Sequence, residues 1–210
     1  MPHIRPVKIR KWFPPSDPLA AYIARLCILR EDFAIEMQGV YQEEVTALDR
    51  HSVAWRRAYF FRNLVRTLME FMSAIDSLKM VPDFILLLEQ QTEPVQAKFD
   101  GLFRAMVDAR PIVKQMRNTI CAHVKHSAVQ EALEGMNYDR WGFLEVGHVL
   151  KDVHYKFAAE IALEILVNGV QEDQREDILR SDLIKIAALF PVFELTDHIL
   201  SMYIIDRNLA

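Results

Sequence analysis

The sequence predicts an all-α protein, a single-domain helical bundle with long antiparallel helices. Apolar residues recur at intervals of three and four along several long segments, and the alternation typical of strands is absent. Prolines fall between these segments, and five of the nine lie within the first 18 residues. With 210 residues, 51% of them apolar, the chain is long enough for one large domain.

The N-terminal segment, residues 1–16, is predicted to be a basic, proline-rich arm. A long helix is expected to begin just after it, because Ser16-Asp17-Pro18 supplies a capping side chain and a proline at the first helical position. This helix is expected to break near Gly39, since glycine is a poor helix former.

The most regular helical pattern runs from His51 to Lys79, without one glycine or proline. Two shorter helices are expected to follow, from Asp83 to Gln91 and from Pro94 to Asp108. Another is expected to begin at Pro111 and to continue through residue 126, because proline is tolerated in the first turn of a helix.

A break near Gly135 and Asn137 ends that helix, and a helical pattern resumes from Trp141 to Leu166. The last two helices are predicted at residues 173–189 and 192–206, separated by Pro191. Together these elements form one helical domain over residues 17–210.

Several classes of protein are excluded by what the sequence lacks. The longest strictly apolar runs, such as Phe84 to Leu88, are far shorter than the roughly 20 residues that span a bilayer. No secretory signal is visible, and two cysteines give neither a disulfide framework nor a Cys-pair zinc site. Motifs of P-loop, dinucleotide-binding and α/β-hydrolase proteins are absent. We expect a cytoplasmic protein with no membrane segment, metal or cofactor.

Basic residues are unevenly distributed, although the formal net charge is only −4. Residues 1–16, 50–69 and 109–130 contain no acidic residue and together hold 13 of the 25 basic residues. Arg62 and Arg66 are four residues apart and share one helix face, which favours a local anion site. The alternative is that these arginines pair with acidic helices of the same or a neighbouring chain.

The most informative motif lies in the third of these segments. Arg117 is followed directly by Asn118 and, after five intervening residues, by His123, which the small Ala122 precedes. This pattern resembles the signature of the HEPN superfamily of all-helical domains. In that signature four to six residues separate Arg from His, often with Asn after the Arg and a small residue before the His. The long arginine-bearing helix that precedes the motif supports the resemblance.

The resemblance implies a metal-independent endoribonuclease that acts as a homodimer, in which the motifs of two protomers form one composite site. Domains of this type occur in toxin–antitoxin and phage-defence systems. An antitoxin or a nucleotidyltransferase-type protein is therefore an expected partner, besides RNA. The resemblance covers roughly residues 20–168, and the arm and the helices within 173–206 lie outside it.

Side-chain chemistry is consistent with the roles that the resemblance implies. RNA carries its own nucleophile, the 2′-OH, so His123 is expected to act as general base and Arg117 to bind phosphate and stabilise the transition state. Asn118 is expected to orient Arg117 or the phosphate. The residues expected to contact RNA are Arg62, Arg66, Lys114, Lys125 and His126.

The spacing of the motif favours a site shared by two protomers. Six residues of α-helix turn through about 600°, which leaves Arg117 and His123 about 120° apart around the axis and roughly 9 Å apart along it. A second protomer can supply the missing partner. The alternative is a non-catalytic, dimeric HEPN-like module that binds a nucleotide or a protein, in which Arg117 pairs with a carboxylate and His123 bonds a backbone carbonyl.

Overall fold

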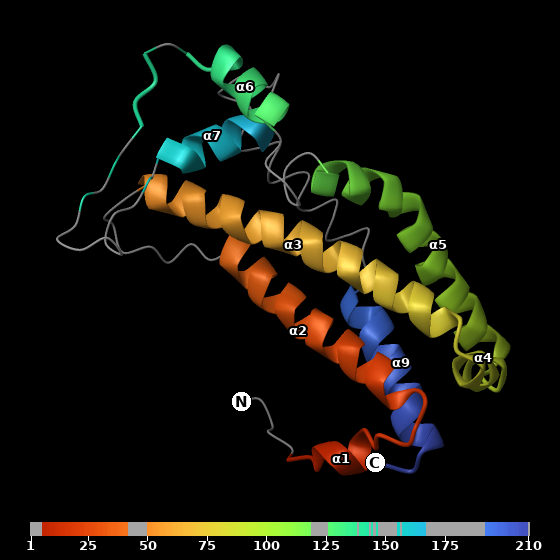
Figure 1. The fold of residues 1–210 in the computed structure, drawn as a ribbon. Coiled ribbons are helices and arrows are strands. Elements are labelled where there is room, and N and C mark those ends of the chain that lie inside the picture. The colour runs from red at the N-terminus through yellow and green to blue at the C-terminus, as the bar shows by residue number, and fades with distance from the viewer. Residues whose placement is uncertain are drawn as a thin grey trace. The chain divides into compact units, whose positions relative to one another are not determined.

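The computed structural model describes residues 6–41, 50–118, 126–137, 139–142, 144, 146, 155, 157–166 and 192–209. Every regular element among these residues is a helix, which confirms the predicted all-α bundle (Figure 1). Along the described part of the chain, no helix has the length and apolar character needed to cross a membrane. The helices are α1 (Ile9–Trp12), α2 (Ala20–Tyr41), α3 (Arg50–Lys79), α4 (Pro82–Glu89), α5 (Glu93–Met116), α6 (His126–Gly135), α7 (Phe157–Leu166) and α9 (Val192–Asp206).

Internal contacts divide the chain into two compact units. Unit 1 comprises Met1–Asp32, Glu70–Arg110 and Ala188–Ala210, and unit 2 comprises Phe33–Met69 and Pro111–Ala187. The two units are described separately, and the expected single domain over residues 17–210 stays a prediction.

The predicted bounds of α3, α4 and α9 agree with the structure to within two residues at each end. The predicted break near Gly135 is confirmed, because α6 ends there. The predicted helix over residues 173–189 lies outside the described residues.

Two predicted interruptions are wrong. Helix α2 continues through Gly39 to Tyr41. Helix α5 is one helix from Glu93 to Met116 and contains Pro111, where the sequence predicts two helices. Proline has no backbone N–H, so the hydrogen bond to the carbonyl of Val107, four residues earlier, is missing, and Val107 itself is 58% exposed. The division between the two units also falls at Pro111.

The helix expected from Trp141 to Leu166 is wrong at the described residues before Phe157. Residues 141, 142, 144, 146 and 155 are not helical, and α7 begins at Phe157. Contacts with α7 hold this segment: a Cβ atom on Gly142 would lie less than 3.0 Å from Phe157, and Arg140 forms an ion pair of 2.7 Å with Glu160. Trp141, which matches the helical spacing, is 84% exposed.

Unit 1 has a hydrophobic core to which its helices all contribute except the four-residue α1. Helix α4 packs against α9. Exposed ion pairs join α2 to α3 (Arg25–Glu70), α5 to α3 (Arg110–Asp76) and α5 to α9 (Lys98–Glu194). Exposed pairs contribute little, so apolar burial is the main source of stability. The largest buried side chains are Leu19, Ile23, Leu26, Phe71, Met72, Ile75, Leu78, Phe84, Phe99 and Tyr203.

Unit 2 contains the remaining parts of α2, α3 and α5 together with α6 and α7. The Thr67 hydroxyl donates a hydrogen bond of 3.0 Å to the Glu36 carboxylate, which joins α3 to α2. Helices α6 and α7 pack against each other around buried Ala132 and Ile165. The other buried apolar residues of this unit are Phe33, Val40, Phe61, Leu64, Val65, Leu68 and Val113.

Candidate functional site

The residues predicted to bind and cleave RNA all belong to unit 2. His123, the expected general base, and Lys125 lie outside the described residues. The structure places Arg62 and Arg66 on α3, Lys114 on α5, Arg117 and Asn118 directly after α5, and His126 at the start of α6.

Four cations among these residues share one property. Arg62 and Arg117 are half-buried, Arg66 and Lys114 are exposed, and no side chain of the four forms a hydrogen bond or ion pair with a residue that the structure describes. No hydrogen bond or ion pair joins two of the predicted site residues that the structure describes. Several cations elsewhere are paired, in the contacts Arg25–Glu70, Arg30–Asp197, Lys98–Glu194, Arg110–Asp76, Arg140–Glu160 and Arg207–Asp17.

Local sequence explains why these cations lack partners. Carboxylates usually neutralise a helical cation from three or four residues away, and residues 50–69 and 109–130 contain none. Glu70 lies four residues after Arg66, but its carboxylate pairs with Arg25 at 3.2 Å. Within the described residues, the alternative in which Arg62 and Arg66 are neutralised by acidic helices of the same chain is therefore not realised.

The backbone winds differently at the motif itself. Arg117 and Asn118 continue α5 with π-helical winding. A π-helical turn is wider than an α-helical turn and occurs frequently at functional sites. The angle of about 120° between Arg117 and His123 assumes α-helical winding throughout, so that expectation does not hold at the first residues of the motif. Asn118 is exposed and accessible to a ligand.

Metal and thiol chemistry find little support in the described residues. They include no group of three or more His, Cys, Asp or Glu side chains that could hold a metal ion. Cys27 is half-buried, and burial raises the pKa of its thiol, which disfavours the reactive thiolate. Cys121 lies outside the described residues.

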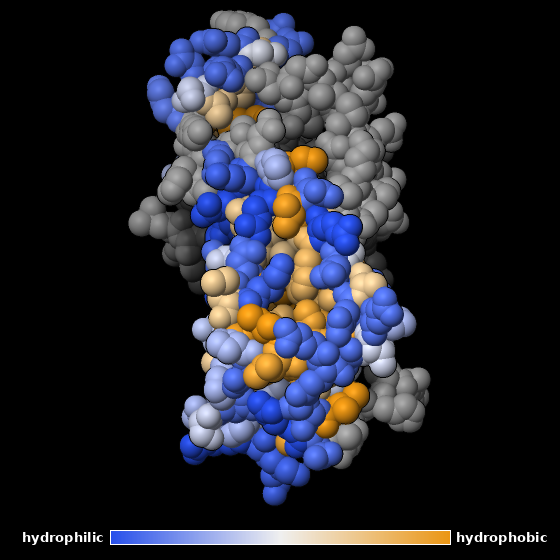
Figure 2. All heavy atoms as spheres, turned by 90° about the vertical axis from the view of Figure 1, so that its right-hand side faces the viewer, coloured by the Kyte–Doolittle hydropathy of each residue, from blue (hydrophilic) through white to orange (hydrophobic). Residues whose placement is uncertain are grey.

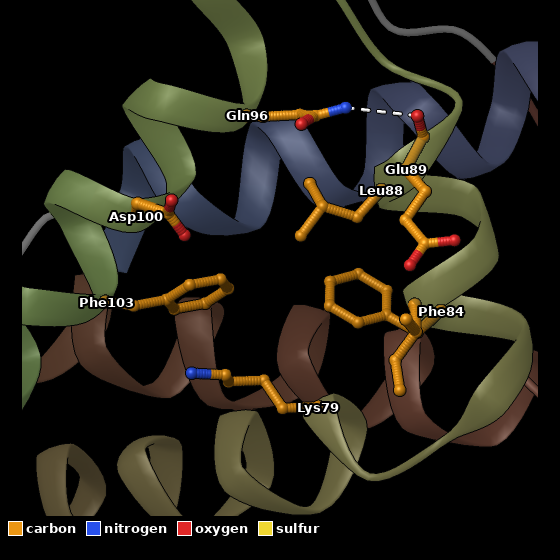
Figure 3. A pocket seen from close by; sticks show the side chains of 8 residues that line it. Lys79, Phe84, Leu88, Glu89, Gln96, Asp100 and Phe103 are labelled. Carbon is orange, nitrogen blue, oxygen red and sulfur yellow. Dashed lines mark hydrogen bonds between the residues drawn. The ribbon is translucent and has the colours of Figure 1, made fainter. Parts of the chain in front are cut away.

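Unit 1 contains a pocket that the sequence does not predict. Its volume is about 250 Å³, and it lies where the end of α3 meets α4 and α5 (Figure 3). The rings of Phe84 and Phe103 point into it, and the carboxylates of Glu89 and Asp100 lie on its α4 and α5 sides (Figure 3). The Lys79 ammonium sits 4.4 Å from the centroid of the Phe103 ring.

A second polar cluster in unit 1 joins the two ends of the chain. The Asp17 carboxylate accepts hydrogen bonds from the Leu19 backbone N–H (2.9 Å), the Tyr203 hydroxyl (3.1 Å) and the Arg207 guanidinium (2.8 Å). Of the segment Ser16-Asp17-Pro18, which is predicted to supply a capping side chain, Asp17 accepts the hydrogen bond from Leu19, the residue just before α2. No sequence signal points to Tyr203 and Arg207, because their approach to Asp17 depends on the tertiary fold.

Comparison with known proteins leaves the family open. No family model matches the chain, and no curated protein or solved structure matches it.

Proposed function

We propose that this protein is a metal-independent endoribonuclease of the HEPN type. The observation that supports the proposal best is the set of cations in unit 2 that lack a partner on the described chain: Arg62, Arg66, Lys114 and Arg117. Cations that have no carboxylate partner among the described residues attract anionic ligands, and Arg in particular suits phosphate. A polyanion with regularly spaced phosphates fits such a set of charges better than a single small anion.

The reaction uses the nucleophile that RNA carries. His123 removes the proton of the 2′-OH, and the oxygen attacks the adjacent phosphorus while the bond to the 5′ oxygen breaks. The departing 5′ oxygen takes up a proton from water and becomes the 5′-hydroxyl. The Arg117 guanidinium donates hydrogen bonds to the phosphoryl oxygens, where negative charge develops in the transition state. Asn118 orients Arg117 or the phosphate. The products are a 2′,3′-cyclic phosphate and a 5′-hydroxyl end.

The remaining basic residues hold the RNA strand. Arg62 and Arg66 share one face of α3, so one strand can pass along both. Lys114, Lys125 and His126 flank the motif and bind neighbouring phosphates. Two protomers contribute their motifs to one composite site in a cytoplasmic homodimer, which an antitoxin or a nucleotidyltransferase-type protein holds inactive in a toxin–antitoxin or phage-defence system.

The test is cleavage of a mixed RNA pool by the full chain in the presence of EDTA. We compare wild type with Arg117→Ala, Arg117→Lys and His123→Ala. The matched control is Arg25→Ala, which removes an exposed cation of unit 1 that is paired with Glu70. Circular dichroism and sedimentation verify folding and oligomeric state for each variant.

We expect wild type and Arg25→Ala to cleave equally. His123→Ala should lose a factor of about 10² to 10⁴ in rate, the usual contribution of a general base. Arg117→Lys keeps the charge but not the two-pronged donor, so it should stay well below wild type. A different outcome is that no protein cleaves RNA, wild type included, while salt-sensitive binding of a nucleotide or RNA persists. That result supports the non-catalytic binding module instead of the nuclease.

A further inference from the structure

The N-terminal arm projects from a fixed anchor. The Tyr203 hydroxyl donates a hydrogen bond of 2.9 Å to the Trp12 carbonyl, and the Phe13 ring stacks on the Tyr203 ring at 6.0 Å. Residues 6–11, just before this anchor, are all exposed, and α1 buries no side chain. The arm is therefore held at its base, while residues 6–11 contact nothing that would bury them.

The exposed part of the arm alternates apolar and cationic side chains, Val7-Lys8-Ile9-Arg10-Lys11. Val7 is 41% exposed and Ile9 73% exposed. No carboxylate among the described residues pairs with the three cations. Such a segment gains free energy if its aliphatic side chains enter an apolar pocket that has carboxylates at its edge.

The pocket between α4 and α5 has this composition. Its apolar lining comes from Phe84, Ile85, Leu88 and Phe103. Glu89 and Asp100 are exposed at its edge and have no ion-pair partner among the described residues, so both can receive a cation (Figure 3).

The surface beside the pocket is also apolar. Met80 is 79% exposed and Leu86 56% exposed. Figure 2 shows one face of the molecule on which hydrophobic side chains, in orange, emerge between hydrophilic ones, in blue. A partner that covers this region removes apolar area from water, in addition to forming ion pairs.

We propose that the arm of a second copy of this chain docks in this pocket. An aliphatic side chain, Ile9 or Val7, enters between Phe84 and Phe103, and the cations beside it pair with Glu89 and Asp100. Because the arm is exposed in its own chain, the occupant comes from another copy. Reciprocal exchange of two arms gives a closed, two-fold dimer, in which each copy contributes one arm and one pocket.

This contact is separate from the proposed nuclease site. The arm and pocket belong to unit 1, and the described nuclease residues belong to unit 2. The two proposals can therefore fail independently. The arm contact buries little area, so we expect a weak association that added salt weakens further.

The test is site-specific photo-crosslinking between full-length chains. A benzophenone amino acid replaces Ile9, and equal amounts of ¹⁴N-labelled and ¹⁵N-labelled protein are mixed before irradiation. Mass spectrometry should find crosslinks from residue 9 of one copy to residues 79–103 of the other. This readout reports the arm contact even if the chains also associate through another surface.

Charge reversal tests the specificity of the contact. An arm variant, Lys8→Glu with Arg10→Glu and Lys11→Glu, and a pocket variant, Glu89→Lys with Asp100→Lys, should each lose the crosslink by about tenfold or more, because like charges then meet. Mixing the two variants restores opposite charges and should restore the crosslink. The matched control, Asp108→Lys with Glu131→Lys, makes the same charge change at exposed positions away from the pocket residues and should crosslink like wild type.

Two results overturn the proposal. One is a crosslink from residue 9 that falls within its own copy or outside residues 79–103. The other is an arm variant that crosslinks as well as wild type. A loss of RNA binding in the arm variant, with no crosslink in wild type, assigns the arm to RNA instead.

Discussion

The ring of Phe60 lies directly against the backbone of Gly39. A Cβ atom at residue 39 would come within less than 3.0 Å of three ring atoms, among them Cγ, the atom that joins the ring to its own Cβ. The base of an aromatic side chain cannot swing away as a flexible chain end can. Glycine therefore allows α2 and α3 to approach closely in unit 2, at the position where the sequence predicts a break in α2.

This contact predicts opposite effects for two glycine substitutions. Gly39→Ala should lower the free energy of unfolding by about 1–3 kcal/mol through overpacking. Gly101→Ala, in α5 with no atom within 4 Å of the new Cβ, should raise it by about 0.5–1 kcal/mol, because alanine favours a helix. Urea denaturation measures both. In a Phe60→Leu background, Gly39→Ala should lower the free energy of unfolding by less than it does in wild type. An equal loss in the two backgrounds would contradict the contact between residues 39 and 60.

Helical periodicity predicts the long helices well. It fails where tertiary contacts determine whether a helix continues or ends. The uninterrupted pattern from residue 51 to 79 corresponds to α3, and Pro191 marks the start of α9. Gly39 and Pro111 predict interruptions, but α2 and α5 continue through them, and the close packing of Phe60 requires glycine at residue 39. Trp141 fits a helical spacing, but contacts of its neighbours with α7 hold the chain in another conformation.

The cluster around Asp17 predicts a dependence of stability on pH. Hydrogen bonds from Arg207 above all, with that from Leu19, lower the pKa of Asp17 below its usual value of 3.8. The stability that the carboxylate contributes is therefore full above about pH 4 and is lost as the pH falls through the lowered native pKa.

Asp17→Asn should lower the free energy of unfolding by about 2 kcal/mol at pH 7, the range for hydrogen bonds to a charged group. The difference from wild type should shrink below about pH 4, as the wild-type carboxylate takes up a proton. Asp108→Asn, at an exposed position, should leave the pH profile unchanged. If the difference in unfolding free energy between wild type and Asp17→Asn stays constant as the pH falls from neutral through the native pKa, the charge of Asp17 has no role in stability.

Tyr203 in the same cluster should titrate late. Burial and the neighbouring Asp17 carboxylate raise the pKa of Tyr203 to about 12. The stability it contributes is present below its unfolded value of about 10 and is lost as the pH rises through the native value. Tyr203→Phe should remove the last step of the tyrosinate absorbance titration, and a wild-type titration complete by about pH 11 would contradict this.

The cations of unit 2 predict how salt affects RNA binding. Each phosphate contact with single-stranded RNA contributes about 0.7 to the slope of log K against log salt concentration. Arg66→Ala and Lys114→Ala should each lower the slope by about that amount, whereas Arg25→Ala, whose side chain is paired with Glu70, should leave it unchanged. Equal slopes in all three variants would show that neither Arg66 nor Lys114 contacts an RNA phosphate.

The charge pattern of the site could be predicted from the sequence, but its geometry could not. Residues 50–69 contain no acidic residue, so no carboxylate of that segment can neutralise Arg62 and Arg66, and this follows from the chain alone. The π-helical winding at Arg117 and Asn118 has no comparable signature in the sequence. The pocket at Phe84 and Phe103 depends on how α4 and α5 meet in space.

The chemical identity of the RNA ends tests the central claim most directly. An RNA is incubated with the full chain in EDTA, and the 3′ ends of the fragments are identified by mass spectrometry, beside the same RNA with a single 2′-deoxy substitution at the main cleavage position. We predict 2′,3′-cyclic phosphate ends that His123→Ala does not produce, and no cleavage at the substituted position. Fragments with 3′-hydroxyl ends, or cleavage that persists at the 2′-deoxy position, would contradict a reaction driven by the 2′-OH and the motif of Arg117 and His123.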